Sequence, residues 1–367
     1  MRQRTGVCFS AGLCVLIFST STFPQEVKSR NAESWELAGS IQLQHLYDPD
    51  RTGDGLVTDN GFRMRRVRLS ARGKVNAFVE STLQIEVRDN SPRLKDAEGR
   101  IKLANSFYLR FGQFKVPVWR EELRSSTNLL LIERSAAAEF LVANNFSARQ
   151  IGVEFGRRPE RGLQMALHLS NGAGEGIRED AGRPKNGFVN NGKLITGRLS
   201  LPLGERVQLG VSAAANRVTR IAQNPAGAMV FAGTQTLLAP DLGLYLHSST
   251  HMQFDIEGGV AFGKLVRELP GGTAGDFLLA DLSGRWTAKL HHALTSLGGL
   301  EAIELAASAC YLEPDDRQED ESLLLRFGPA IYFGKTCRLQ INGEVDKPLP
   351  AGGETVLQVR SQMNFTF

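Results

Sequence analysis

Hydrophobic and polar residues alternate along most of this chain with a period of two, whereas an amphipathic helix would repeat every 3.6 residues. The last eleven residues show the pattern most clearly. Every second residue from Leu357 to Phe367 is apolar except Ser361, and the residues between them are polar. Such a segment is expected to form a β-strand with one apolar and one polar face. Helical periodicity is confined to short turns within 120–142.

Fifteen segments of this kind follow one another. They lie near 35–46, 62–76, 78–89, 100–115, 150–157, 161–170, 193–202, 205–215, 237–247, 252–263, 276–288, 300–312, 321–333, 336–346 and 355–367. Tight turns between some segments contrast with long connections between others. Bacterial outer-membrane barrels combine short turns at one end with long loops at the other, and their strand number is even. The pattern therefore predicts an all-β fold, a transmembrane antiparallel β-barrel of sixteen strands. We place the sixteenth strand within 218–234.

A soluble β-sandwich or adhesin would show the same alternation. Such domains have about 100 residues, and no repeat or linker of that spacing is visible in the 367 residues. The polar face is also rich in Arg, Gln, Asn and Glu on strand after strand, which suits a water-filled lumen better than an outer sheet surface. Both observations favour the barrel.

The composition excludes two further classes of protein. The chain has 43 basic and 39 acidic residues, a net charge of +4, and this balance argues against a nucleic acid as partner. Beyond the N-terminus there is no run of 18 apolar residues, which excludes a helical membrane protein. Outer-membrane lipid is the expected surrounding of a barrel.

The N-terminus has the pattern of an export signal. Arg2 and Arg4 precede an apolar run over 6–18, which is too short to span a bilayer, and small residues follow it. We expect a signal peptide over 1–24, cleaved within 21–25, and a barrel domain over 25–367. The alternative is an uncleaved anchor or a buried segment.

Basic residues concentrate on one face of the stretch 61–74. From Arg66 onward, the basic residues Arg66, Arg68, Arg72 and Lys74 occupy even positions, and Val67 and Leu69 occupy odd ones. A basic charge turned toward hydrocarbon at mid-membrane costs about 2–4 kcal/mol. The apolar face is therefore expected to meet lipid, and the basic face to form a cationic ladder in the lumen, where it would raise the local anion concentration.

Other chemistry is weakly represented. The alternation places Cys310 on the lumen face and Cys337 on the lipid face, and one strand lies between the two strands that carry them. We therefore expect both cysteines to be free thiols. The stretch 48–55 is similar to a calcium loop but lacks the downstream glutamate, and we interpret it as a turn. Serines and histidines occur without a linking catalytic motif. We expect no metal, no cofactor and no enzymatic activity.

The chain resembles a known family, the phosphate-selective porins O and P of Gram-negative outer membranes. The resemblance covers most of the mature chain. The landmarks are FRMRRVRLSARGKV (62–75), LRFGQFKVPV (109–118), IERS (132–135), ARQIGVEF (148–155), NGAG (171–174), GRLSLPL (197–203) and VRSQMNFTF (359–367). The resemblance implies a sixteen-stranded barrel, commonly a homotrimer. An inward-folded third loop narrows its lumen, and a ladder of arginines and lysines passes small anions such as phosphate or polyphosphate.

By this resemblance the constriction loop covers 116–147. Ser125, Ser126 and Arg134 are similar to the groups that the family offers to the anion, with Arg65 and Arg66 added from the wall. The complete candidate set for the lumen and constriction is Arg65, Arg66, Arg68, Arg72, Lys74, Arg120, Arg124, Ser125, Ser126 and Arg134.

The loop departs from the family pattern at Glu121 and Glu122, where basic residues are expected and where acidic side chains would repel an oxyanion. Phosphate selectivity therefore stays open. In an alternative interpretation, the loop arginines pair with these glutamates and with Glu133 and only hold the loop in place. The alternative functions are a weakly selective general porin and a non-conducting structural or adhesin barrel.

Overall fold

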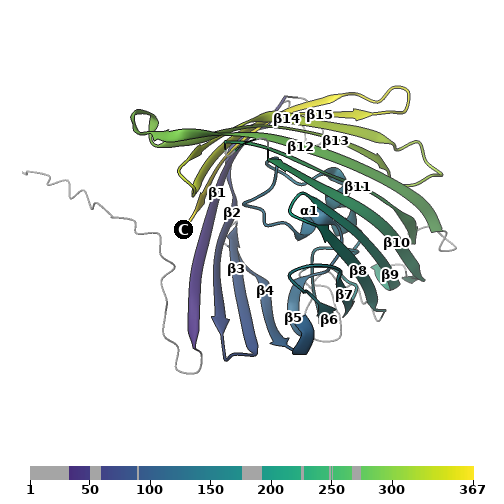
Figure 1. Ribbon diagram of the computed structural model, residues 1–367. Coiled ribbons are helices and arrows are strands. Elements are labelled where there is room, and N and C mark those ends of the chain that lie inside the picture. Colours follow the sequence, from purple (N-terminus) through teal and green to yellow (C-terminus); the bar gives the residue numbers. More distant parts are fainter. Residues whose placement is uncertain are drawn as a thin grey trace, which may run out of the picture.

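Sixteen antiparallel strands form a closed barrel in the computed structural model, which describes residues 33–49, 59–88, 91–175, 192–224, 227–247, 249, 251–266 and 274–367. Each strand pairs with its neighbours in sequence, and the first pairs with the last (Figure 1). The predicted fold class is confirmed. The predicted signal peptide and residues 50–55 of the acidic turn lie outside the described residues.

The strands are β1 Ser34–Asp48, β2 Asp59–Lys74, β3 Val79–Arg88, β4 Ser91–Lys102, β5 Phe107–Lys115, β6 Arg149–Arg157, β7 Gln164–Ser170, β8 Leu194–Leu203, β9 Val207–Asn224, β10 Gly227–His247, β11 Met252–Val266, β12 Ala274–Leu294, β13 Leu300–Glu313, β14 Ser322–Phe333, β15 Cys337–Pro348 and β16 Val356–Thr366. Short 3-10 helices, η1 Ala104–Ser106 and η2 Thr295–Leu297, form two of the tight turns. No helix in the described part of the chain is long and apolar enough to cross a membrane.

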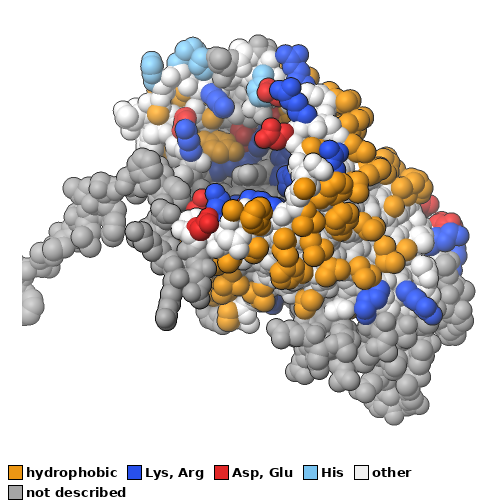
Figure 2. All heavy atoms as spheres, turned by 60° about the horizontal axis from the view of Figure 1, so that its bottom comes forward, with side chains coloured by type: hydrophobic (Ala, Val, Ile, Leu, Met, Phe, Trp, Pro, Cys, Tyr) orange, Lys and Arg blue, Asp and Glu red, His pale blue; other side chains and the backbone are white. Residues whose placement is uncertain are grey.

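The alternation separates the two faces of the wall as expected. Gln42 and Gln44 are fully buried inside the barrel, whereas Leu69 and Phe327 are each 58% exposed on the outside. Figure 2 shows the outer hydrophobic side chains as a broad band beside a hollow edged by charged side chains. The polar face of the strands is the lumen face, because only that face meets water within the bilayer.

The position predicted for the sixteenth strand is wrong. Residues 218–224 belong to the long strand β9 and residues 227–234 to the long strand β10, and the overlooked strand is β4. The charged residues of β4 occupy both odd and even positions, because a β-bulge interrupts the period of this strand. Gln84 pairs with Asp96 and Ile85 with Leu94, so Lys95 is an extra residue without a partner in β3.

The two cysteines of the barrel, Cys310 and Cys337, are free, as predicted. Cys310 is 1% exposed, and its sulfur accepts a hydrogen bond of 3.3 Å from the backbone N–H of Ala137. Cys337 is half-buried on a strand two places further along.

Gly39 of β1 and Phe367, which follows β16, pair through their backbones where these two strands close the barrel. The N–H of Gly39 donates to the carbonyl of Phe367 at 2.7 Å, and the N–H of Phe367 donates back at 3.0 Å. A Cβ added to Gly39 would lie 2.3 Å from the Phe367 ring. Glycine at this position therefore leaves room for the terminal aromatic ring on the neighbouring strand.

We expect Gly39→Val, or removal of Phe367, to lower the yield of closed barrel, because each change disrupts this last contact of the seam. The measurement is the fraction of outer-membrane protein whose gel mobility changes on boiling. Gly197→Val on β8 is the matched control, since a Cβ there would meet nothing within 4 Å. Equal yields for the two valine variants would show that the Gly39 contact is dispensable.

Candidate functional site

The connection between β5 and β6 runs inside the barrel and narrows its lumen (Figure 1). It covers residues 116–148 and contains two short helices, α1 Arg120–Leu123 and α2 Ala136–Ala143. The hydroxyl of Ser135 caps α2 by accepting from the N–H of Ala138 at 3.2 Å. The position agrees closely with the loop of 116–147 that the resemblance implied.

Apolar packing fixes one side of this loop to the inner wall. Val118, Trp119 and Leu141 of the loop are at most 2% exposed and belong to one cluster with Phe277 and Leu279 of β12. The lumen face of this part of the wall is therefore apolar where the loop covers it. A Cβ on Gly259 of β11 would lie 2.8 Å from the Trp119 indole, so this glycine allows the close approach.

Ion pairs fix the polar side of the loop. Arg120 donates to Asp241 of β10 at 3.1 Å, and Arg124 pairs with Glu257 of β11. Arg134 pairs with Glu122 at 2.6 Å within the loop. All three loop arginines of the candidate set are thus engaged. This supports the interpretation that they hold the loop, although two of the partners are carboxylates of the wall.

Glu121 and Glu122 are also engaged. Glu122 is 5% exposed, and both carboxylate oxygens of Glu121 accept from the backbone N–H of Ser135 at 3.0 and 3.1 Å. Burial raises the pKa of Glu121, although the hydrogen bonds from Ser135 act in the opposite direction. Neither carboxylate lines the main cavity described next, so neither faces the ions that would enter it.

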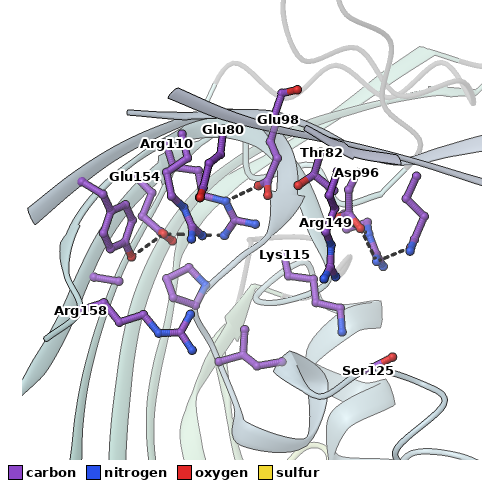
Figure 3. Close-up of a pocket in the computed structure, with 18 of the residues that line it drawn as sticks. Glu80, Thr82, Asp96, Glu98, Arg110, Lys115, Ser125, Arg149, Glu154 and Arg158 are labelled. Atoms are coloured by element: carbon purple, nitrogen blue, oxygen red, sulfur yellow. Dashed lines mark hydrogen bonds and ion pairs between the residues drawn. The ribbon is translucent and has the colours of Figure 1, made fainter. Parts of the chain in front are cut away.

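A cavity of about 730 Å³ lies between the loop and strands β1 to β8. Ser125 and Ser126 line it from the loop, and Arg68, Arg72 and Lys74 line it from β2. Figure 3 shows Arg110 directed at Glu98 and Arg149 beside Asp96 on the wall, with Lys115 and Ser125 on the side of the loop. A second space of about 350 Å³ shares Arg158 and Arg198 with the first and adds Arg120 and Arg124.

Cationic side chains outnumber carboxylates around the main cavity by ten to five. The carboxylates are Glu36, Glu80, Asp96, Glu98 and Glu154, and the cations are Arg68, Arg72, Lys74, Arg100, Arg110, Lys115, Arg149, Arg157, Arg158 and Arg198. Two of these cations, Arg68 and Arg198, also pair at 2.6 Å with Glu86 and Asp241, which do not line the cavity, so part of the excess of five is neutralised. The remaining positive charge lowers the electrostatic energy of an anion in this part of the lumen.

The three basic residues of β2 that line the cavity fall into two groups. Arg72 and Lys74 are exposed in the cavity and form no ion pair within the described residues. Arg68 donates to Glu86 at 2.6 Å and to the hydroxyl of Ser126 at 2.9 Å. Only the first group is therefore unpaired in the cavity.

Arg65 and Arg66 lie side by side because β2 contains a β-bulge. Gln42 pairs with Arg66, and the next residue of β1, Leu43, pairs with Met64, so Arg65 is the extra residue. Both arginines consequently point into the lumen, where they contact Glu133 of the loop at 2.6 and 3.5 Å. Neither lines the main cavity.

Several basic residues of the cavity were missed at the level of sequence. Arg110 and Arg149 lie in two of the landmark stretches, and Arg100 lies on the overlooked strand β4. The sequence signal for these residues was a basic side chain at every second position of a strand, the same pattern as in β2. Each falls on a strand whose polar face is mixed in charge, and this obscured the pattern.

Comparison with known proteins supports the resemblance. The family model of the phosphate-selective porins O and P matches residues 41–243, more than half of the chain. No curated protein matches the sequence.

Solved structures share the fold at low identity. The outer-membrane channel DcaP of Acinetobacter baumannii is 12% identical, with a TM-score of 0.63 over 93% of this chain and 99% of its own. An anion-selective porin from Comamonas acidovorans is 14% identical, with a TM-score of 0.59 over 91% and 99%. The trimer form of OmpT from Vibrio cholerae is 10% identical, with a TM-score of 0.58 over 91% and 99%. The family-model match over more than half of the chain shows that it belongs to the phosphate-selective porins O and P, a family of outer-membrane porins of Gram-negative bacteria.

Proposed function

We propose that this porin forms a water-filled channel that prefers small anions, phosphate among them. The observation that carries the proposal is the excess of five positive charges around the main cavity. Arg72 and Lys74 are exposed there without carboxylate partners in the described part of the chain. Conduction needs several weak sites in series, and unpaired cations on successive positions of a wall provide them.

Phosphate would be attracted through charge-assisted hydrogen bonds, which arginine forms in a bidentate manner. Ser125 and Ser126 of the loop could add hydroxyl donors, although Ser126 already accepts from Arg68. We propose the same assembly as in the trimer form of OmpT, a homotrimer, and a mature chain from which residues 1–24 have been removed.

One observation favours a weakly selective general porin as the second candidate. Most arginines of the lumen are paired with carboxylates, including Arg110, Arg149 and Arg198. Paired charges produce a weaker field than free ones, and salt screens this field further. The degree of selectivity therefore depends on the few unpaired cations.

A recording from a planar bilayer tests the proposal. In a potassium chloride gradient we expect a reversal potential with the sign of anion preference, and added phosphate should reduce the chloride current. A reversal potential near zero would favour the general porin. The absence of any conductance from a correctly assembled barrel would show a structural or adhesin role and overturn the proposal.

A further inference from the structure

Three arginines of β2 converge on a single carboxylate of the loop, Glu133. Its Oε1 accepts from Nε of Arg65 at 2.6 Å and lies 3.8 Å from Nη2 of Arg63. Its Oε2 accepts from Nη2 of Arg65 at 2.9 Å and lies 3.5 Å from Nη2 of Arg66. The amide of Gln44 donates to Oε1 at 3.0 Å. One negative charge thus faces three positive ones.

The geometry around Arg65 is that of oxyanion recognition. Its Nε and Nη2 form two parallel hydrogen bonds to the two carboxylate oxygens, the bidentate arrangement in which arginine binds carboxylates and phosphates alike. Burial alone would raise the pKa of Glu133, but the hydrogen bond and charge of Arg65, assisted by Arg66, outweigh it and lower the pKa. The side chain is therefore an anion whenever the protein is near neutral pH.

The cluster is open to the lumen on one side. The side chain of Arg63 is 46% exposed, whereas those of Arg65 and Arg66 are 18% and 5% exposed. Glu139 and Glu86 also attract the charge of Arg65, but more weakly than Glu133 does. A small anion could therefore approach Arg63 from the lumen, but it would find the fork of Arg65 occupied.

We propose that Glu133 is a built-in counter-anion that occupies an oxyanion site formed by Arg63, Arg65, Arg66 and Gln44. The carboxylate keeps this site from binding permeating anions, and it thereby lowers the affinity for anions in the part of the lumen next to these arginines. Replacing it by an uncharged residue opens the site to phosphate. This inference rests on the proposed function for its physiological meaning but not for its test.

The first experiment measures phosphate binding to the purified barrel in detergent by isothermal titration. We expect Glu133→Ala to bind phosphate at least about tenfold more tightly than the parent, the change given by one additional charge-assisted hydrogen bond. Glu133→Gln keeps the shape of the side chain and is expected to change affinity in the same direction by less. It also serves if the alanine variant does not assemble.

Two further variants separate a site from a general field. Glu80→Gln removes a carboxylate that pairs with Lys102 at 2.5 Å in the same lumen, so it adds the same charge without exposing an arginine cluster. We expect it to raise phosphate affinity through the added charge alone, and by much less than Glu133→Ala does. Combining Arg65→Ala with Glu133→Ala removes the fork and should return the affinity to that of the parent.

The proposal is overturned if Glu133→Ala and Glu133→Gln both bind phosphate as the parent does, or if Glu80→Gln gains as much as they do. Because binding is measured directly, these outcomes are independent of conductance. A parent channel without anion preference would overturn the proposed function alone, and the titration would still decide the role of Glu133.

Discussion

Charge reversal at Arg72 and Lys74 is expected to remove most of the anion preference of the channel while leaving the barrel intact. Each substitution by glutamate changes the charge of the lumen by two, so the excess of five positive charges around the cavity falls to one. Both side chains are exposed and have no ion-pair partner among the described residues, so no buried interaction is lost. The effect should be largest at low salt, where the Debye length at 0.01 M is about 30 Å.

The measurement is the reversal potential in a salt gradient, with glutamine at both positions as the intermediate variant. The glutamine variant should fall between the parent and the glutamate variant if charge alone matters. The same substitutions at Arg66 and Arg68 should behave differently. Arg66 is 4% exposed, and Arg68 is paired with Glu86, so glutamates there would bury repelling carboxylates and disturb the loop. An unchanged permeability ratio in the Arg72 and Lys74 variant would mean that the ions take another path.

Arginines on the lipid face are expected to prevent assembly. Leu69 of β2 and Leu167 of β7 are 58% and 57% exposed on the outside of the wall. An arginine at the bilayer midplane costs about 2–4 kcal/mol, so two of them approach the whole stability of an ordinary protein domain. The combined variant Leu69→Arg and Leu167→Arg should give little protein whose gel mobility changes on boiling.

The matched control places the two arginines at the neighbouring positions of the same strands, as Ser70→Arg and Ala166→Arg. Ser70 and Ala166 point into the lumen, and Ala166 lines the main cavity, so arginines there should be tolerated. If the variant with Leu69→Arg and Leu167→Arg assembled as well as this control, the assignment of the lipid and lumen faces would be wrong.

The period of two was sufficient to predict the barrel, because a wall between lipid and water requires it of every strand. It failed where a strand departs from that period. The bulge at Lys95 puts the charged residues of β4 at both odd and even positions and so hid this strand, and the extensions of β9 and β10 were mistaken for a separate strand. The bulge at Arg65 likewise adds an inward residue that a strict alternation does not predict.

The candidate site was predictable in position but not in pairing. The resemblance identified the loop and its arginines. The partners of Arg120 and Arg124 are Asp241 and Glu257, which lie more than a hundred residues away in sequence. No local pattern encodes such a pairing, because it depends on where a loop of 33 residues folds back against the wall. Whether an arginine is free or paired is therefore a property of the fold.

The seam between β1 and β16 has a consequence for the order of events during folding. Gln42 and Asn364 are hydrogen-bonded across it although 322 residues separate them in sequence. The first strand has no partner on that side until the eleven-residue strand β16 pairs with it, and until then the open sheet presents two unpaired edges that other chains can join. Loop closure over so long a segment is slow, which prolongs this exposure. The period before closure is thus the time at which this chain is most prone to aggregation, and a defect at either terminus extends it.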